Sequence, residues 1–202
     1  MCIRDSRRTA PVAVSALLAL ASPAYAQHAP NATAAEGLDV SGSMRLRYET
    51  VDGQVRPGFN PSDELIDLRT IVTATYKAGP FRIGGEVYDS RSWLANTRTP
   101  ISTNEVNTLE LVQAWVGADI DHPFGPGTSL GLRAGRMQID LGSRRLVAAD
   151  DYRNTTNGFT GLRADLGLKT LKATLIYVLP QQRRPDDLTA ILDNKIGFDH
   201  EG

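Results

Sequence analysis

A regular alternation of apolar and polar residues near the start of the sequence most constrains the fold. The two interleaved sets are Leu38, Val40, Gly42, Met44, Leu46 and Tyr48, and Asp39, Ser41, Ser43, Arg45, Arg47 and Glu49. Successive side chains of a β-strand point to opposite faces, so this pattern predicts a strand with one apolar face and one wetted face. The uninterrupted run is as long as a tilted membrane-spanning strand and longer than a typical strand of a soluble protein.

Six further stretches carry strand signals. They are Glu64–Ala78, a strand that starts at Phe81, Glu105–Asp119, Thr128–Gln138, Phe159–Leu166 and Thr170–Leu179. In the strand Glu105–Asp119, Val112 is expected to share a face with Ala114 and Val116, although the alternation breaks at Leu109–Leu111. A polar loop is expected over Ser90–Thr103, and another loop after Pro180.

The connections between these strands alternate between long and short. Gly79-Pro80 forms the tightest turn, whereas the charged connection Asp140–Gly158 is the longest. Outer-membrane barrels show this asymmetry, with long loops on one side of the membrane and short turns on the other. The sequence predicts an all-β fold, a transmembrane antiparallel up-and-down β-barrel. About seven strands are present, so residues 38–202 are expected to be the N-terminal part of a larger barrel.

The first 37 residues carry a targeting pattern. Arg7-Arg8, an apolar run and Ala24-Tyr25-Ala26 predict a signal peptide over residues 1–26, with cleavage before Gln27. The apolar run is shorter than the roughly 20 residues needed to span a bilayer. Residues 1–6 resemble a translated sequencing adapter, and residues 27–37 are expected to form a flexible leader. We therefore expect export to the outer membrane of a Gram-negative bacterium.

Arginine dominates the basic residues. The formal net charge is −1, which does not indicate a nucleic-acid partner, and lysine occurs only at Lys77, Lys169, Lys172 and Lys195. Guanidinium groups pair with carboxylates in a planar fork, and rings of basic side chains select anions in channels. The sequence predicts a substrate path, or constriction, formed by Arg69, Arg82, Arg133, Arg136, Arg144, Arg145, Arg153 and Arg163. The rival hypothesis is a wall network in which Asp39, Glu49, Asp67 and Glu86 neutralise the strand arginines.

Nothing in the sequence predicts catalysis, a metal site or a cofactor. Cys2 is the only cysteine, and His28, His122 and His200 match no metal-ligand spacing. Asp150 and Asp151 are adjacent, so on an extended chain they point apart and cannot face each other across a substrate. A channel needs no such chemistry.

Three segments carry a family resemblance. They are Gly135-Arg136-Met137, Gly142-Ser143-Arg144-Arg145-Leu146-Val147 and Phe159-Thr160-Gly161-Leu162-Arg163, and Gln113-Ala114-Trp115-Val116 adds a fourth. Their order and spacing resemble the alginate-export family of outer-membrane porins. Thr160 stands where that family usually has aspartate, and Asn157-Gly158 where arginine is common.

The resemblance implies a monomeric barrel, surrounded by outer-membrane lipid, with an electropositive pore. We expect a channel for anionic polysaccharides or oligosaccharides, alginate-like in character, or for related small anionic solutes. The alternatives are a general or hydrophobic-solute porin without anion selectivity, a membrane-embedded barrel enzyme, and a soluble secreted β-sandwich for adhesion or binding.

Overall fold

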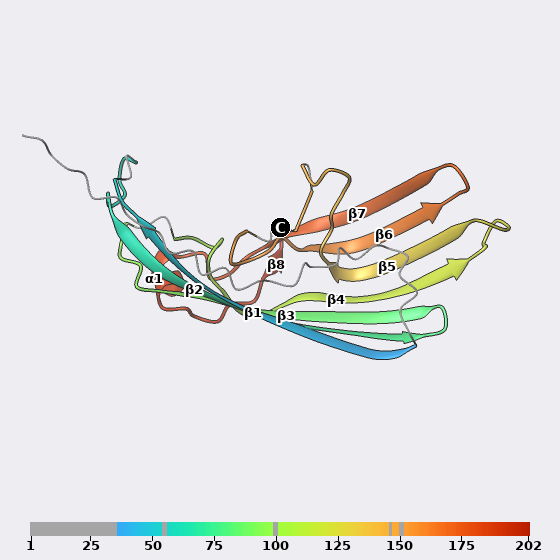
Figure 1. Ribbon diagram of the computed structural model, residues 1–202, viewed down its shortest axis with the longest axis horizontal. Helices are drawn as coiled ribbons and strands as arrows, with labels where there is room; N and C mark the ends of the chain where they lie inside the picture. The colour runs from blue at the N-terminus through green and yellow to red at the C-terminus, as the bar shows by residue number, and fades with distance from the viewer. Residues whose placement is uncertain (1–35, 54–55, 99–100, 146, 150–151) are drawn as a thin grey trace, which may run out of the picture. The chain divides into compact units, whose positions relative to one another are not determined.

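One antiparallel sheet makes up the fold. The computed structural model describes residues 36–53, 56–98, 101–145, 147–149 and 152–202, so the predicted signal peptide and nearly all of the leader lie outside it. The strands are β1 (Gly37–Val51), β2 (Asp63–Ala78), β3 (Phe81–Trp93), β4 (Asn107–Asp121), β5 (Ser129–Met137), β6 (Phe159–Gly167), β7 (Lys172–Gln182) and β8 (His200–Glu201). Each strand pairs with the next in chain order (Figure 1). The all-β up-and-down fold is therefore confirmed, and within the described residues the sheet does not close.

The connections follow the predicted asymmetry. The three short turns, which join β2 to β3, β4 to β5 and β6 to β7, lie at one end of the sheet (Figure 1). Gly79 adopts φ +55° in the tightest of them, a left-handed conformation that glycine reaches without steric cost. The β1–β2, β3–β4 and β5–β6 connections are the long ones.

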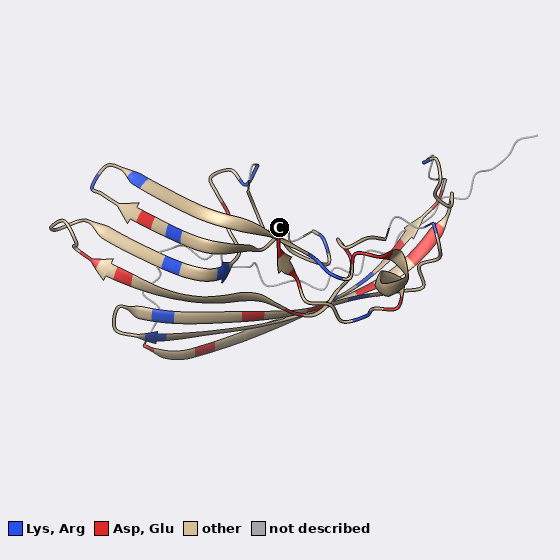
Figure 2. Ribbon diagram, turned by 180° about the vertical axis from the view of Figure 1, so that it is seen from behind, with Lys and Arg blue, Asp and Glu red and all other residues tan. Residues whose placement is uncertain are grey.

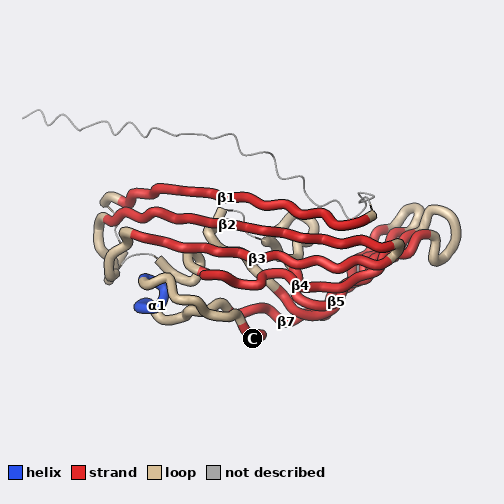
Figure 3. The backbone as a smooth tube through the Cα atoms, turned by 90° about the horizontal axis from the view of Figure 1, so that it is seen from below, coloured by secondary structure: helices blue, strands red, loops and turns tan. Residues whose placement is uncertain are grey.

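The loop predicted after Pro180 contains structure that the sequence did not indicate. It forms a short helix, α1 (Leu188–Leu192), seen in blue in Figure 3. The carboxylate of Asp187 caps it by accepting a hydrogen bond from the backbone N–H of Ala190 at 2.9 Å. The described part of the chain contains no helix long and apolar enough to cross a membrane. The prediction that the last residues lie wholly in a loop is wrong at His200–Glu201, which pairs with Gln181–Gln182.

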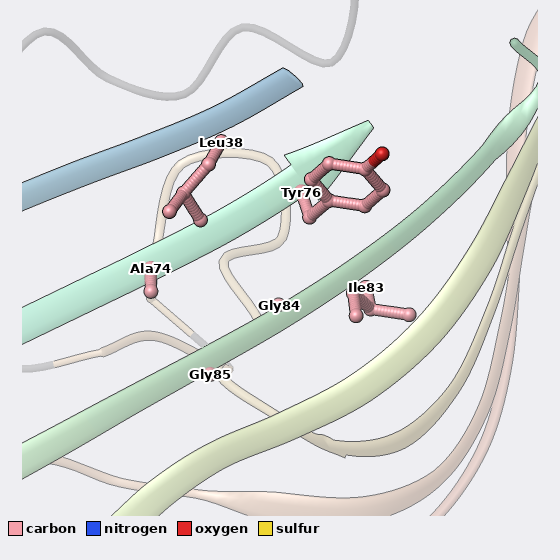
Figure 4. A pocket seen from close by; sticks show the side chains of 6 residues that line it. All are labelled: Leu38, Ala74, Tyr76, Ile83, Gly84 and Gly85. Atoms are coloured by element: carbon pink, nitrogen blue, oxygen red, sulfur yellow. The ribbon is translucent and has the colours of Figure 1, made fainter. Parts of the chain in front are cut away.

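The strand register separates two kinds of side chain onto two faces. Leu38 lies opposite Tyr76, and Leu46 lies opposite Leu68, so the apolar positions of β1 and β2 fall together. Tyr76 in turn lies opposite Ile83 of β3. We call this side of the sheet the apolar face. Figure 4 shows a pocket on it, lined by Leu38, Ala74, Tyr76, Ile83, Gly84 and Gly85.

The other side, the polar face, carries the charged partners of these residues. Arg45 lies opposite Arg69, and Arg47 lies opposite Asp67. Asp67 and Arg69 are buried, because other parts of the chain cover them. A small apolar cluster of Ile71, Tyr88 and Val112 lies among them.

Two details of the strand prediction are wrong. Val112 is not on the face of Ala114 and Val116: the β3–β4 register shifts between Glu86 and Val87, and Val112 is the extra residue. Such a bulge sets two residues against one, so Val112 packs with Ile71 and Tyr88 instead. In addition, β3 continues through Ser90 to Trp93, where a loop was expected.

Candidate functional site

The long β5–β6 connection lies against the polar face of β1 and β2. Two guanidinium groups of β1 hold it by its backbone: Arg45 donates to the carbonyl of Arg153 at 2.7 Å, and Arg47 donates to that of Tyr152 at 2.7 Å. Arg69 of β2 also donates to the Arg153 carbonyl, at 3.1 Å. We call residues 152–157 of this connection the docked segment.

Asn154 holds the docked segment through its side-chain amide. Its side-chain nitrogen lies 3.1 Å from the Leu68 carbonyl, 3.2 Å from that of Arg91 and 2.8 Å from that of Glu105. Its own carbonyl accepts a 2.6 Å hydrogen bond from Ser90. Asn154 is fully buried, so one amide group joins β2, β3 and the β3–β4 connection. Asn154 was not predicted as a functional residue.

Carboxylates surround the arginines beneath the docked segment. Arg47 contacts Glu49 at 2.8 Å, Asp67 at 2.9 Å and Glu105 at 3.3 Å. Burial, and then repulsion by Asp67, raise the pKa of Glu105 above its ordinary value, and Arg47 opposes the rise. Arg153 itself donates to the side-chain oxygen of Asn104 at 3.1 Å. At this site, the guanidinium groups hold a loop and balance acids.

A second group of arginines lies nearer the short turns. The register places Arg82 of β3, Arg133 of β5 and Arg163 of β6 at one level across the sheet, with Gly117 of β4 between the first two. Arg82 forms an ion pair with Asp119, and Arg163 binds Asp165 through Nε at 2.7 Å and Nη2 at 3.0 Å. Figure 2 shows the basic and acidic residues interspersed on these strands.

Arg133 is held differently from its two neighbours. Its guanidinium carbon lies 4.7 Å from the ring centroid of Trp115, a cation–π contact. A Cβ on Gly84 would come within 2.5 Å of the same ring, so the tryptophan needs a glycine beside it. The Trp115 ring is therefore confined between the β3 backbone and a guanidinium group.

Arg136 lies near the end of β5, where three segments meet. It pairs with the fully buried Glu110 at 2.8 Å and donates to the carbonyl of Asp199 at 3.0 Å. The backbone N–H of Asp199 donates to the other oxygen of Glu110 at 2.9 Å. Burial, followed by repulsion from Glu110, raises the pKa of Asp199 to about 6. Arg136 thus fastens the segment after β7 to β4.

Arg144 and Arg145 are adjacent in the β5–β6 connection but differ in their contacts. Arg144 binds Asp140 at 3.2 Å and donates to the carbonyl of Ala149 at 2.8 Å, which closes the loop on itself. Arg145 is exposed, and the described residues offer it no hydrogen bond or ion pair. The eight arginines predicted to form the substrate path therefore lie in four separate places. They are the docked segment (Arg69 and Arg153), the level near the short turns (Arg82, Arg133 and Arg163), the end of β5 (Arg136) and the β5–β6 connection (Arg144 and Arg145).

The described residues include no group of three or more histidine, cysteine, aspartate or glutamate side chains able to hold a metal ion. The residues that sequence reasoning missed are Asn154 and Tyr152. No sequence signal marks these two residues, because their partners lie far away in the sequence. The composition of the polar run Asn154-Thr155-Thr156 is also the same as that of an exposed loop.

A family model described as alginate export matches residues 37–197, which contain β1 to β7 and α1. No curated protein and no solved structure matches the chain.

Proposed function

The chain belongs to the alginate-export family, and from that membership we propose that it forms an outer-membrane channel for anionic polysaccharides, oligosaccharides or smaller anionic solutes. The family is one of transport porins, and its name and the strand architecture suggest an outer-membrane location. Closure of the sheet into a barrel, which would pair the free edge of β1 and the part of the β7 edge that β8 leaves free, is part of the proposal. An unpaired edge in lipid costs several kcal/mol per backbone group.

The observation that carries the proposal is the family match over a sheet with two chemically distinct faces. Large apolar side chains such as Met44, Leu175 and Tyr177 are exposed on one face, which suits contact with lipid hydrocarbon. Most charged side chains of the strands are on the opposite face, which in a barrel would enclose water; Asp89 and Arg91, an ion pair near the end of β3, lie opposite Thr70 and Leu68 on the apolar side. Passage of a solute along such a wall requires no bond to be made or broken.

Anion preference would come from guanidinium groups that no carboxylate neutralises directly. Arg133, which stacks on Trp115, is the candidate on the strands, and the exposed Arg145 is the candidate on the loop. A fixed positive charge lowers the energy of an anion in a narrow passage, and exposure to water keeps the binding weak enough for release.

The ion pairs favour a second candidate function. Arg82, Arg136 and Arg163 each bind a carboxylate, so much of the positive charge on the polar face is balanced locally. A wall of balanced pairs would suit a general porin with little anion preference, which is the alternative within the same class.

The reversal potential of the full-length protein in planar bilayers under a KCl gradient separates the two candidates. The proposal expects anion preference, weakened in Arg145→Glu because the charge of an exposed loop residue is reversed there. An anion preference that is unchanged in Arg145→Glu would show that the selective charge is not at this loop position. Cation preference, or none, in the unmutated channel would reject the anion path in favour of the general porin.

A further inference from the structure

Tyr152 is a large aromatic residue exposed on the polar side of the sheet. Its side is established by its contacts, because Arg45 and Arg47 of the polar face both donate to its carbonyl, at 3.3 Å and 2.7 Å. The residue is 77% exposed. Contact with lipid explains the exposed tyrosines of the apolar face, such as Tyr177, but it cannot explain an aromatic residue on the charged side.

The backbone that carries the ring is firmly held. Besides the carbonyl of Tyr152, the carbonyl of Arg153 is bound by Arg45 and Arg69, and the next residue, Asn154, is fully buried. A binding group mounted on a fixed backbone loses little conformational freedom when a ligand arrives. Tyr152 therefore combines an anchored main chain with an exposed side chain.

The surroundings of the ring favour stacking over ion binding. The guanidinium carbon of Arg47 lies 5.3 Å from the Tyr152 ring centroid. Arg47 is already bound to Glu49, Asp67 and Glu105, so it brings little free charge to a solute. The face of an aromatic ring is electron-rich and apolar, and it attracts the polarised C–H groups on the flat side of a pyranose. A sugar ring matches this surface better than a small inorganic anion does.

Trp115 does not offer the same surface. A guanidinium group lies over each ring, Arg47 over Tyr152 and Arg133 over Trp115, but Tyr152 is 77% exposed. The Trp115 ring, in contrast, lies between Arg133 and the β3 backbone at Gly84. Stacking by a solute would require one of these neighbours to move.

From these observations we propose that Tyr152 is a sugar-binding residue of the channel: its ring stacks on pyranose units of a saccharide as they pass the docked segment. The inference rests on the proposed function and narrows its solute class to saccharides. Because stacking does not depend on the charge of the sugar, Tyr152 would bind neutral and uronate units alike, whereas anion preference would arise elsewhere.

Current block in planar bilayers tests this with two probes, a uronate oligosaccharide and a neutral maltooligosaccharide of equal length. In the full-length protein, Tyr152→Ala should raise the half-blocking concentration of both probes about tenfold. Tyr152→Leu, which keeps an apolar side chain but removes the ring, should do the same. Tyr152→Phe should stay within about twofold of the unmutated channel, because the ring is retained. The backbone anchors involve the Tyr152 carbonyl and should survive all three substitutions.

Tyr177→Ala is the matched control. Tyr177 is 79% exposed, nearly the same as Tyr152, but lies on the apolar face, so its removal should leave both half-blocking concentrations unchanged. Unmutated affinity in Tyr152→Ala or Tyr152→Leu would overturn the inference, as would the absence of block by either sugar. The reversal potential, recorded in the same membranes, measures anion preference and so tests the proposed function separately, because none of these variants changes a charge.

Discussion

Arg47 and Arg133 both project from the polar face, yet their neighbours give them different roles. Arg47 is bound to three carboxylates and a loop carbonyl and also lies over the Tyr152 ring, whereas Arg133 rests on the Trp115 ring without a direct carboxylate partner among the described residues. The alternation of each strand was enough to predict that these arginines lie on a wetted face. The rival hypothesis of a wall network named Glu49 and Asp67, and both pair with Arg47. The sequence could not predict the contact of Arg47 with Tyr152, because Tyr152 lies in a connection whose path no local pattern determines, and Glu105, expected at the start of a strand, lies in the β3–β4 connection instead. At this scale, the sequence predicts which face a charge is on and leaves its function open.

The buried carboxyl group of Asp199 predicts that the stability of the protein depends on pH. Its pKa is raised from 3.8 to about 6 by burial and by Glu110, while the backbone N–H of Arg184, the charge of Arg183 and the side chain of Asn107 oppose the rise. The folded state therefore holds a proton that the unfolded chain releases. Its contribution to stability is complete below about pH 3.8 and is lost as the pH rises through about 6.

The Asp199→Asn variant should lack this pH dependence, because an amide does not titrate. In the unmutated protein, the free energy of unfolding should fall between pH 4 and pH 7 by up to about 3 kcal/mol more than in the variant, since one pKa unit is worth about 1.4 kcal/mol. Urea unfolding of both full-length proteins in lipid vesicles at several pH values measures the difference. Parallel pH profiles would contradict the assigned environment of Asp199.

Among the elements, the positions of β1 and β2 were predicted well. For the β5–β6 connection, the sequence predicted a long charged loop but not the path of its backbone. β1 follows strict alternation, whereas β2 departs from it at Leu65, Thr70 and Ile71; the observed bounds of both strands extend the predicted ones by a residue or two at most ends. β4 was harder, because a bulge at Val112 inserts a residue and shifts the alternation without any mark in composition. The path of the docked segment depends on Asn154, whose partners are separated from it by 49, 63 and 86 residues.

Asn154→Ala tests whether the docked segment is held as described. The substitution removes an amide group that reaches three backbone carbonyls, and leaving buried groups unsatisfied costs about 1–3 kcal/mol each. We expect the segment to leave the polar face while the strands stay paired. Single-channel conductance of the full-length protein should therefore increase.

Asn157→Ala is the control for this experiment. The side chain of Asn157 donates to the carbonyl of Ala148 within the same connection, at 3.1 Å, so its loss should leave the docking to β2 and β3 intact. Equal conductance in Asn154→Ala and the unmutated channel would show that the segment does not narrow the path.

For the whole molecule, the assignment as a membrane barrel depends more on the separation of the apolar and polar faces than on any single arginine. The family match, the one-sheet topology and the short turns at one end agree with a membrane barrel. The topology and the turns follow from the strand pattern, whereas the family resemblance rests on segments such as Gly135-Arg136-Met137. A soluble sandwich would need a second layer against residues such as Leu38, Met44 and Leu46, which are exposed in the described sheet. The claim on which the account depends is that these side chains meet lipid, while their neighbours in the strand meet water.

Spin labels on adjacent residues of β1 test that claim most directly. Val40 is exposed on the apolar face and Ser41 follows it on the polar face. Cys2 is the only cysteine of the sequence and can be replaced by serine if it is retained. In the full-length protein in vesicles, a label at Val40→Cys should collide mainly with lipid-dissolved oxygen, and one at Ser41→Cys mainly with a water-soluble nickel chelate. Equal access of the nickel chelate to both positions, or the reverse assignment, would contradict the membrane-channel account.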